Sequence, residues 1–134
     1  MLFGGGETMA ARRRFVATTV HAHGIRAVVL VLRRPMSRLA FSVALGGLAR
    51  EHGEDLLRVK GLVAFADRDT GPAAIHAVQH TLYPPHWFDD WPDTDRRSRL
   101  VFIVRDIDSD ILLERFAAGD PVLAETGDMT TGGR

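Results

Sequence analysis

The chain has 134 residues, enough for one domain with a core of its own. Its 17 lysines and arginines balance its 17 aspartates and glutamates, so the zero formal net charge favours neither nucleic acid nor an anionic membrane as a partner. It has no cysteine, which excludes disulfides and thiolate metal sites, and its longest apolar run, Ala27 to Leu32, is too short to span a bilayer. We therefore expect a soluble cytoplasmic protein.

Composition divides the chain into three parts. Residues 1–14 show no hydrophobic periodicity and are expected to be a flexible N-terminal arm. Residues 15–119 carry the predicted helices and strands and form the expected domain, in which residues 15–20 are compatible with a short first strand. The Pro, Thr and Gly content of residues 120–134 predicts a flexible tail.

The first clear elements are a strand and a helix. The β-branched run within residues 25–33 predicts a buried strand. Ser37 can cap a helix that runs to about His52, because its hydroxyl accepts a hydrogen bond from a free amide of the first turn. Gly53 is expected to end this helix in the left-handed conformation. Apolar residues three and four apart form its buried stripe: Phe41, Ala44, Leu45 and Leu48.

Residues 55–66 predict a central strand with two unlike faces, since successive side chains point to opposite sides. One face is suited to a core and consists of Leu57, Val59, Gly61, Val63 and Phe65. The other places Arg58 and Lys60 beside Leu56, Leu62 and Ala64. A mixed cationic and apolar face indicates a docking surface, the alternative being a half-exposed strand with solvated cations. Gly61 predicts a bulge or a close approach by another backbone.

The second half predicts two strands and a helix. After a turn at residues 67–72, residues 74–83 read as an antiparallel return strand, and Pro84-Pro85 leads into a loop at residues 86–92. A strand over residues 99–106 precedes a helix that Asp108 or Ser109 can cap and that runs through Phe116.

This order of elements predicts an α+β fold, an antiparallel sheet with two helices packed on one face as in a ferredoxin-like sandwich. The predicted core includes Phe41, Leu45, Leu48, Val59, Val63, Phe102, Leu112 and Phe116.

No catalytic motif is present. The phosphate-binding pattern Gly-x-x-x-x-Gly-Lys-Ser/Thr is absent, and no Gly-x-Ser-x-Gly elbow supports a nucleophilic serine. We therefore expect that the chain is not an enzyme and holds no cofactor of its own.

Histidines are the candidate metal ligands, because neutral imidazole binds zinc and cobalt. The candidates are His76, His80 and His86. On a strand, His76 and His80 lie about 13 Å apart and do not share an ion without ligands from other elements. We expect at most weak zinc or cobalt binding, the alternative being structural or interface histidines.

Three stretches carry a family resemblance through their order and spacing: GEDLLRVKG at 53–61, IHAVQH at 75–80 and RSRLVFI at 97–103. Together they resemble the C-terminal domain of the CobW-like GTPases. The similarity runs from about His21 to Phe116, and Pro35, Phe41 and Leu45 fall where that family has its strand end and first helix.

By this resemblance, full-length members join an N-terminal P-loop GTPase domain to such a domain and deliver zinc, cobalt or related ions. Their nucleotide motifs and their Cys-x-Cys-Cys metal motif lie in the N-terminal domain, so GTP and magnesium act only through a separate P-loop domain, in cis or in trans. The resemblance implies a non-catalytic regulatory or client-docking domain whose partners are that GTPase domain and a metalloprotein client. Arg58 and Lys60 are then the candidate interface residues. The alternative is a free-standing small-ligand or metal-binding module.

Overall fold

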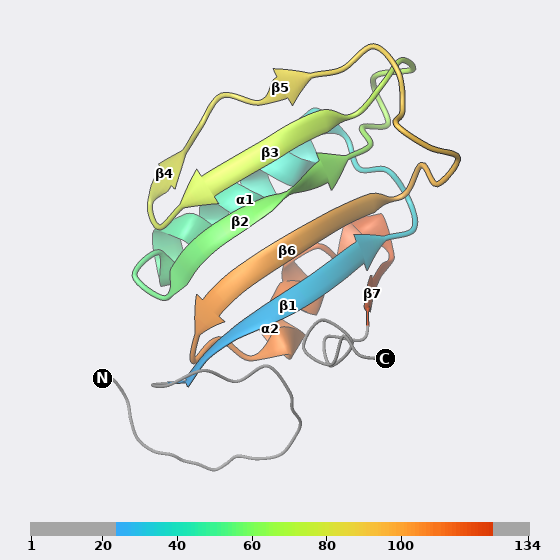
Figure 1. Ribbon diagram of the computed structural model, residues 1–134. Coiled ribbons are helices and arrows are strands. Elements are labelled where there is room, and N and C mark those ends of the chain that lie inside the picture. Colours follow the sequence, from blue (N-terminus) through green and yellow to red (C-terminus); the bar gives the residue numbers. More distant parts are fainter. Residues whose placement is uncertain (1–23, 125–134) are drawn as a thin grey trace.

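The computed structural model describes residues 24–124. Its strands form one antiparallel sheet in the order β4-β3-β2-β6-β1-β7, and β5 also pairs with β3. Both helices lie on the same side of this sheet, behind it in Figure 1. In chain order the elements are β1 (Ile25–Leu32), α1 (Arg38–His52), β2 (Leu56–Val63), β3 (Ala73–Val78), β4 (Thr81–Leu82), β5 (His86–Trp87), β6 (Ser98–Arg105), α2 (Ser109–Arg115), a 3-10 turn (Ala117–Gly119) and β7 (Pro121–Leu123).

The predicted α+β sandwich is confirmed. Strands β2, β6, β1 and β7 and helices α1 and α2 have the order and antiparallel pairing of a ferredoxin-like unit. Strands β3, β4 and β5 are inserted in sequence between β2 and β6, and they widen the sheet beyond β2 (Figure 1). Among residues 24–124, no helix is long and apolar enough to cross a membrane.

The core lies between the sheet and the two helices. All eight residues predicted to be buried are buried. Alternation is clearest in β6, where Leu100, Phe102 and Val104 are fully buried and their neighbours are not. Phe116 follows α2 and packs on Phe102, with ring centroids 5.8 Å apart. Burying such side chains provides the main stabilisation of the fold, since each removes roughly 150–250 Å² of surface from water.

Both helix starts follow the predicted capping. The Ser37 side chain accepts a hydrogen bond from the Ala40 amide at 3.0 Å, and Asp108 accepts one from the Asp110 amide at 3.0 Å. The prediction for Gly53 was wrong, because its φ of −58° and ψ of −31° are right-handed. Space is the reason for a glycine here, since a Cβ atom would collide with the Ala49 carbonyl and the His80 ring.

Residues 74–83 do not form the single strand that was predicted. Strand β3 ends at Val78, and β4 folds back on it with Val78 paired to Thr81. Gln79 takes a left-handed φ of 52° in the intervening tight turn, which also contains His80. Tight turns with a positive φ usually contain Gly or Asn, and their presence marks the turn in a sequence. Because glutamine stands at this position instead, the sequence does not indicate a reversal, and it was missed.

Two further short strands were not expected. β5 lies within the predicted loop at residues 86–92, and β7 lies within the predicted tail, so that tail prediction was wrong for residues 121–123. Their two and three residues are too few for a period to be recognised, and pairing with β3 and β1 creates them. The predicted arm at residues 1–14 and the possible strand at residues 15–20 lie outside the described residues.

Strand β2 differs from simple alternation at its start. The β2–β6 register shifts between Leu56 and Arg58, so Leu56 lies opposite Val104 and is fully buried, not on the cationic face as predicted. The β-bulge adds one residue to β2 relative to β6, and the Leu56 side chain therefore points to the core side of the sheet. The expected close approach at Gly61 is confirmed, because a Cβ atom there would lie 2.8 Å from the Leu100 Cα atom.

Candidate functional site

The sheet surface turned away from the helices is the candidate site, and we call it the open face. It is formed by the residues of β2, β3 and β6 that alternate with core residues. They are Arg58, Lys60, Leu62, Ala74, His76, Val78, Arg99, Val101, Ile103 and Arg105.

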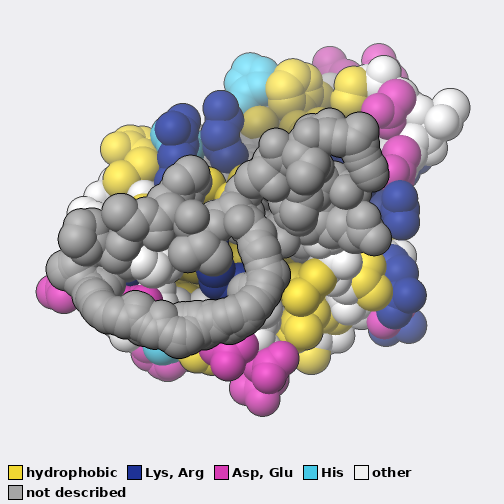
Figure 2. Space-filling model, turned by 60° about the horizontal axis from the view of Figure 1, so that its bottom comes forward, with side chains coloured by type: hydrophobic (Ala, Val, Ile, Leu, Met, Phe, Trp, Pro, Cys, Tyr) yellow, Lys and Arg dark blue, Asp and Glu magenta, His cyan; other side chains and the backbone are white. Residues whose placement is uncertain are grey.

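The two predicted interface residues lie on this face, side by side along β2. Lys60 lies opposite His76 on β3 and opposite Val101 on β6, while Arg58 lies opposite Ile103. Directly opposed residues have Cβ atoms roughly 5 Å apart, so each cation stands within reach of apolar side chains. Both cations are exposed. Figure 2 shows Lys and Arg side chains next to histidine and hydrophobic side chains at one margin of the molecule.

The open face is positive. Its residues on β2, β3 and β6 include no carboxylate, and among residues 24–124 only Arg105 of its cations has an ion-pair partner, with Nε 3.1 Å from Asp55 Oδ1. Arg58, Lys60 and Arg99 make no ion pair with any described residue. Three cations among valine, isoleucine and leucine side chains form a surface suited to an acidic protein partner with some apolar area.

Arg99 was missed as part of this site. The sequence shows it in the basic cluster of residues 96–99, which reads as solvated charge. The structure separates that cluster, because Ser98 is buried and its Oγ accepts a hydrogen bond from the Ala64 amide at 2.8 Å. Counting alternation back from Leu100 would have placed Arg99 on the face opposite the core.

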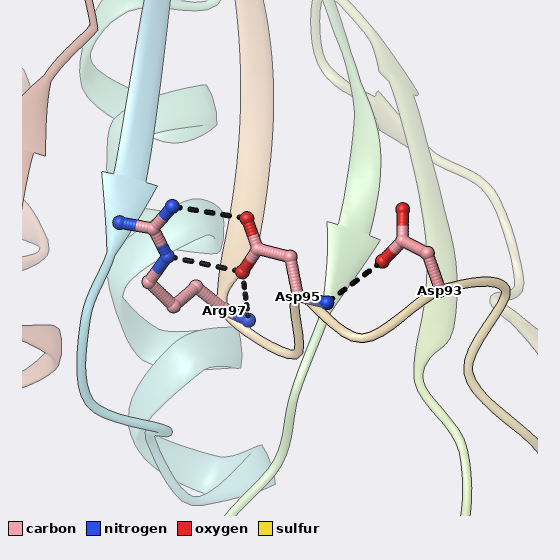
Figure 3. A network of polar contacts seen from close by, with 3 residues as sticks. All are labelled: Asp93, Asp95 and Arg97. Atoms are coloured by element: carbon pink, nitrogen blue, oxygen red, sulfur yellow. Dashed lines mark hydrogen bonds and ion pairs between the residues drawn. The ribbon is translucent and has the colours of Figure 1, made fainter.

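Arg97 is neutralised locally in the loop before β6 (Figure 3). Its Nη2 atom lies 2.9 Å from Asp95 Oδ2, and its Nε and backbone amide both donate to Asp95 Oδ1. The Asp95 amide in turn donates to Asp93 Oδ1 at 3.0 Å. The hydrogen bonds from the Arg97 side chain lower the pKa of Asp95 to about 2. The network thus leaves Arg99 as the open-face cation contributed by this cluster.

The three candidate metal ligands lie on different elements of the inserted segment. His76 is on β3 and stacks on Tyr83 with ring centroids 5.1 Å apart, and its Nε2 atom is buried without a hydrogen-bond partner among the described residues. His80 is in the β3–β4 turn with its ring against Gly53, and His86 on β5 packs edge-on to Phe88. Among residues 24–124, no three His, Asp or Glu side chains are grouped so as to hold a metal ion.

The family follows from a comparison with known proteins. Residues 25–119 match the family described as the cobalamin synthesis protein CobW C-terminal domain. The chain belongs to this family. Its CobW C-terminal domain superposes on the zinc-bound YjiA GTPase from E. coli with a TM-score of 0.64 and 25% identity. The zinc-bound triple mutant of YjiA GTPase matches with the same values.

The match covers 72% of this chain but 30% of the YjiA chain, so the CobW C-terminal domain corresponds to less than a third of that GTPase. The resemblance seen in the sequence is confirmed, and the family match spans residues 25–119. The GTPase activity in the name of the YjiA structure belongs to that longer protein.

Proposed function

We propose that this chain is the non-catalytic docking domain of a CobW-like GTPase that delivers zinc or cobalt, and that its open face receives the P-loop GTPase domain or a metalloprotein client. The observation that carries the proposal is the row of cations among apolar residues on β2 and β6, of which Arg58, Lys60 and Arg99 make no ion pair with any described residue. Membership of the CobW C-terminal family and the similarity to part of a GTPase support the choice of partner.

The chemistry of the open face favours such a role. Burying the apolar residues between the cations supplies affinity, while Arg58 and Lys60 orient the partner and accelerate encounter through its negative charge. Both side chains are exposed in the free domain, so removing them is expected to cost little folding stability. Binding and folding should therefore respond differently to the same substitution.

The test measures binding of this chain to a separately produced P-loop domain of a CobW-like GTPase by titration calorimetry, and Arg58→Ala/Lys60→Ala is the test variant. We expect binding to weaken roughly tenfold or more, with a nearly unchanged thermal midpoint. The control variant Arg33→Ala/Arg34→Ala removes the same charge from the segment after β1, which contributes none of the residues that define the open face, and should bind like the parent chain. Equal affinities of parent and test variant would refute the assignment of the open face.

The same experiment tests binding of a metalloprotein client to the open face. A zinc or cobalt metalloprotein that binds this chain should lose affinity with the same double substitution and keep it with the control. Metal transfer belongs to the complete GTPase, so the proposal predicts that the chain alone does not accelerate loading of an apo client.

A further inference from the structure

One buried polar atom on the open face has no hydrogen-bond partner. It is Nε2 of His76, on strand β3, and it is the one side-chain atom of this kind among residues 24–124. A buried polar group left without a partner costs the fold roughly 1–3 kcal/mol, so such atoms are uncommon in folded domains. His76 Nε2 can therefore still form a hydrogen bond with another molecule.

Lys60 and Tyr83 lie on either side of His76. Lys60 is directly opposite His76 on β2, and the Cβ atoms of directly opposed residues are roughly 5 Å apart. On the other side, the Tyr83 amide donates a hydrogen bond to the His76 carbonyl at 3.1 Å. The two rings are stacked, with centroids 5.1 Å apart and planes inclined by 21°. The stack thus fixes the plane of the imidazole next to the Lys60 side chain.

The side chains on either side of His76 can move without opening the sheet. Lys60 is exposed, and Tyr83 is 48% exposed. Exposed side chains change rotamer within picoseconds to nanoseconds. A partner can therefore reach the imidazole although Nε2 is covered in the free domain.

A carboxylate is the group that fits between His76 and Lys60. It has two acceptor oxygens, while an imidazole with its proton on Nε2 and a lysine ammonium are both donors. Lys60 makes no ion pair with any described residue, and the open-face residues of β2, β3 and β6 include no carboxylate. We infer that His76 and Lys60 together bind one carboxylate of an acidic protein partner. This inference rests on the proposed function, because it names the chemical group by which the open face holds its partner.

Arg58 provides for a second carboxylate. It lies two residues before Lys60 on the same face of β2, so the two Cα atoms are roughly 7 Å apart, and it also makes no ion pair with a described residue. Ile103 and Val101 lie opposite these two cations on β6. The matching partner surface has two carboxylates about 7 Å apart beside apolar side chains. A second copy of the chain does not match, because its open face would bring cations against cations.

His76→Phe tests the site, because phenylalanine keeps an aromatic ring for the stack with Tyr83 and removes the nitrogen. In titration calorimetry with the P-loop domain of a CobW-like GTPase, we expect binding roughly tenfold or more weaker than that of the parent chain. The thermal midpoint of the free variant should stay the same or rise, since apolar atoms replace a buried nitrogen without a partner. The control His52→Phe makes the same change at the end of α1, on the helix side of the sheet, and should bind like the parent (Figure 1).

A double-mutant cycle shows whether His76 and Lys60 bind the same group. Lys60→Met removes the charge and keeps an unbranched side chain. In the Lys60→Met background, His76→Phe should weaken binding much less than it does in the parent chain. Losses that simply add would be evidence against a shared carboxylate and would overturn the inference.

The remaining outcomes separate this inference from the proposed function. If Arg58→Ala/Lys60→Ala weakens binding and His76→Phe does not, the carboxylate site is wrong and the docking face stands. If neither variant changes binding, both are wrong. A lower thermal midpoint for His76→Phe would show that Nε2 has a partner in the free chain, which also contradicts the inference. Tighter binding of a single-stranded oligonucleotide of about 20 thymidines than of the P-loop domain would show that the site receives phosphate, and would refute it as well.

Discussion

The substitution Gly61→Ala tests how closely β2 and β6 approach at the centre of the sheet. Gly61 is paired directly with Leu100, and its missing side chain would point at the Arg99 carbonyl and lie 2.8 Å from the Leu100 Cα atom. Carbon atoms normally approach to about 3.5–4.0 Å, so the strands must separate locally or shift. Neither obstructing atom belongs to a flexible side chain, so the added methyl group has no low-cost way to fit.

The expected change in the free energy of unfolding of Gly61→Ala follows from two opposing effects. Overpacking in a well-ordered interior costs about 1–3 kcal/mol. Alanine lowers the entropy of the unfolded chain and returns about 0.4–1 kcal/mol. We therefore expect the free energy of unfolding to fall by roughly 1–2 kcal/mol and the thermal midpoint to fall by about 5–10 °C. Urea unfolding followed by circular dichroism should show a lower midpoint with an unchanged slope.

Gly46→Ala is the matched control, because the same methyl group meets nothing within 4 Å there. This variant should gain roughly 0.5–1 kcal/mol from helix propensity. The two alanine substitutions should thus have opposite signs. A Gly61→Ala chain as stable as the parent would show that β2 and β6 do not hold each other at this distance.

Three further predictions concern ligands and pH. The chain alone should neither bind nor hydrolyse GTP, because it has no phosphate-binding loop, and micromolar GTP affinity in calorimetry would contradict this. Zinc or cobalt should bind at most weakly, since His76, His80 and His86 lie on separate elements, and a tight stoichiometric site lost on His80→Ala would be evidence against it. Asp95 should titrate near pH 2 by NMR instead of its ordinary 3.8. Because its folded pKa is the lower one, its contact with Arg97 stabilises the fold above about pH 4 and loses this effect as the pH falls towards 2. A measured value near 3.8 would exclude the contact.

Regular periodicity made most of the fold predictable. The helical stripe from Phe41 to Leu48 and the alternation in β6 have a buried and an exposed side that can be read directly from apolar residues. Ser37 and Asp108 mark the starts of the two helices, because each side chain accepts a hydrogen bond from a backbone amide two or three residues later. This hydrogen bond does not depend on contacts with distant parts of the chain. These features are local, and the structure confirms them.

The missed features depend on contacts between distant parts of the chain. The bulge that buries Leu56 arises from pairing with β6, some 50 residues away, and nothing in the local pattern marks it. The turn at Gln79 uses a residue that rarely adopts a positive φ, so its sequence resembles a continuing strand. For the candidate site, Arg58 and Lys60 were identified by alternation in β2, while Arg99 was hidden in a run of charges.

Strand β5 also provides an optical reporter for the inserted segment. Trp87 is one of two tryptophans in the chain, and it packs on the core residue Phe65 with ring centroids 5.7 Å apart. The Arg68 guanidinium lies 4.8 Å and that of Arg38 6.0 Å from the Trp87 ring, which joins α1 to the sheet edge through cation–π contacts. Trp87 is 38% exposed in the folded domain, and detachment of this edge would increase the contact of its indole with water while the β2–β6 pair stays closed. Emission from Trp87, with Trp91 replaced by Phe, would therefore distinguish partial opening of the insertion from loss of the whole domain.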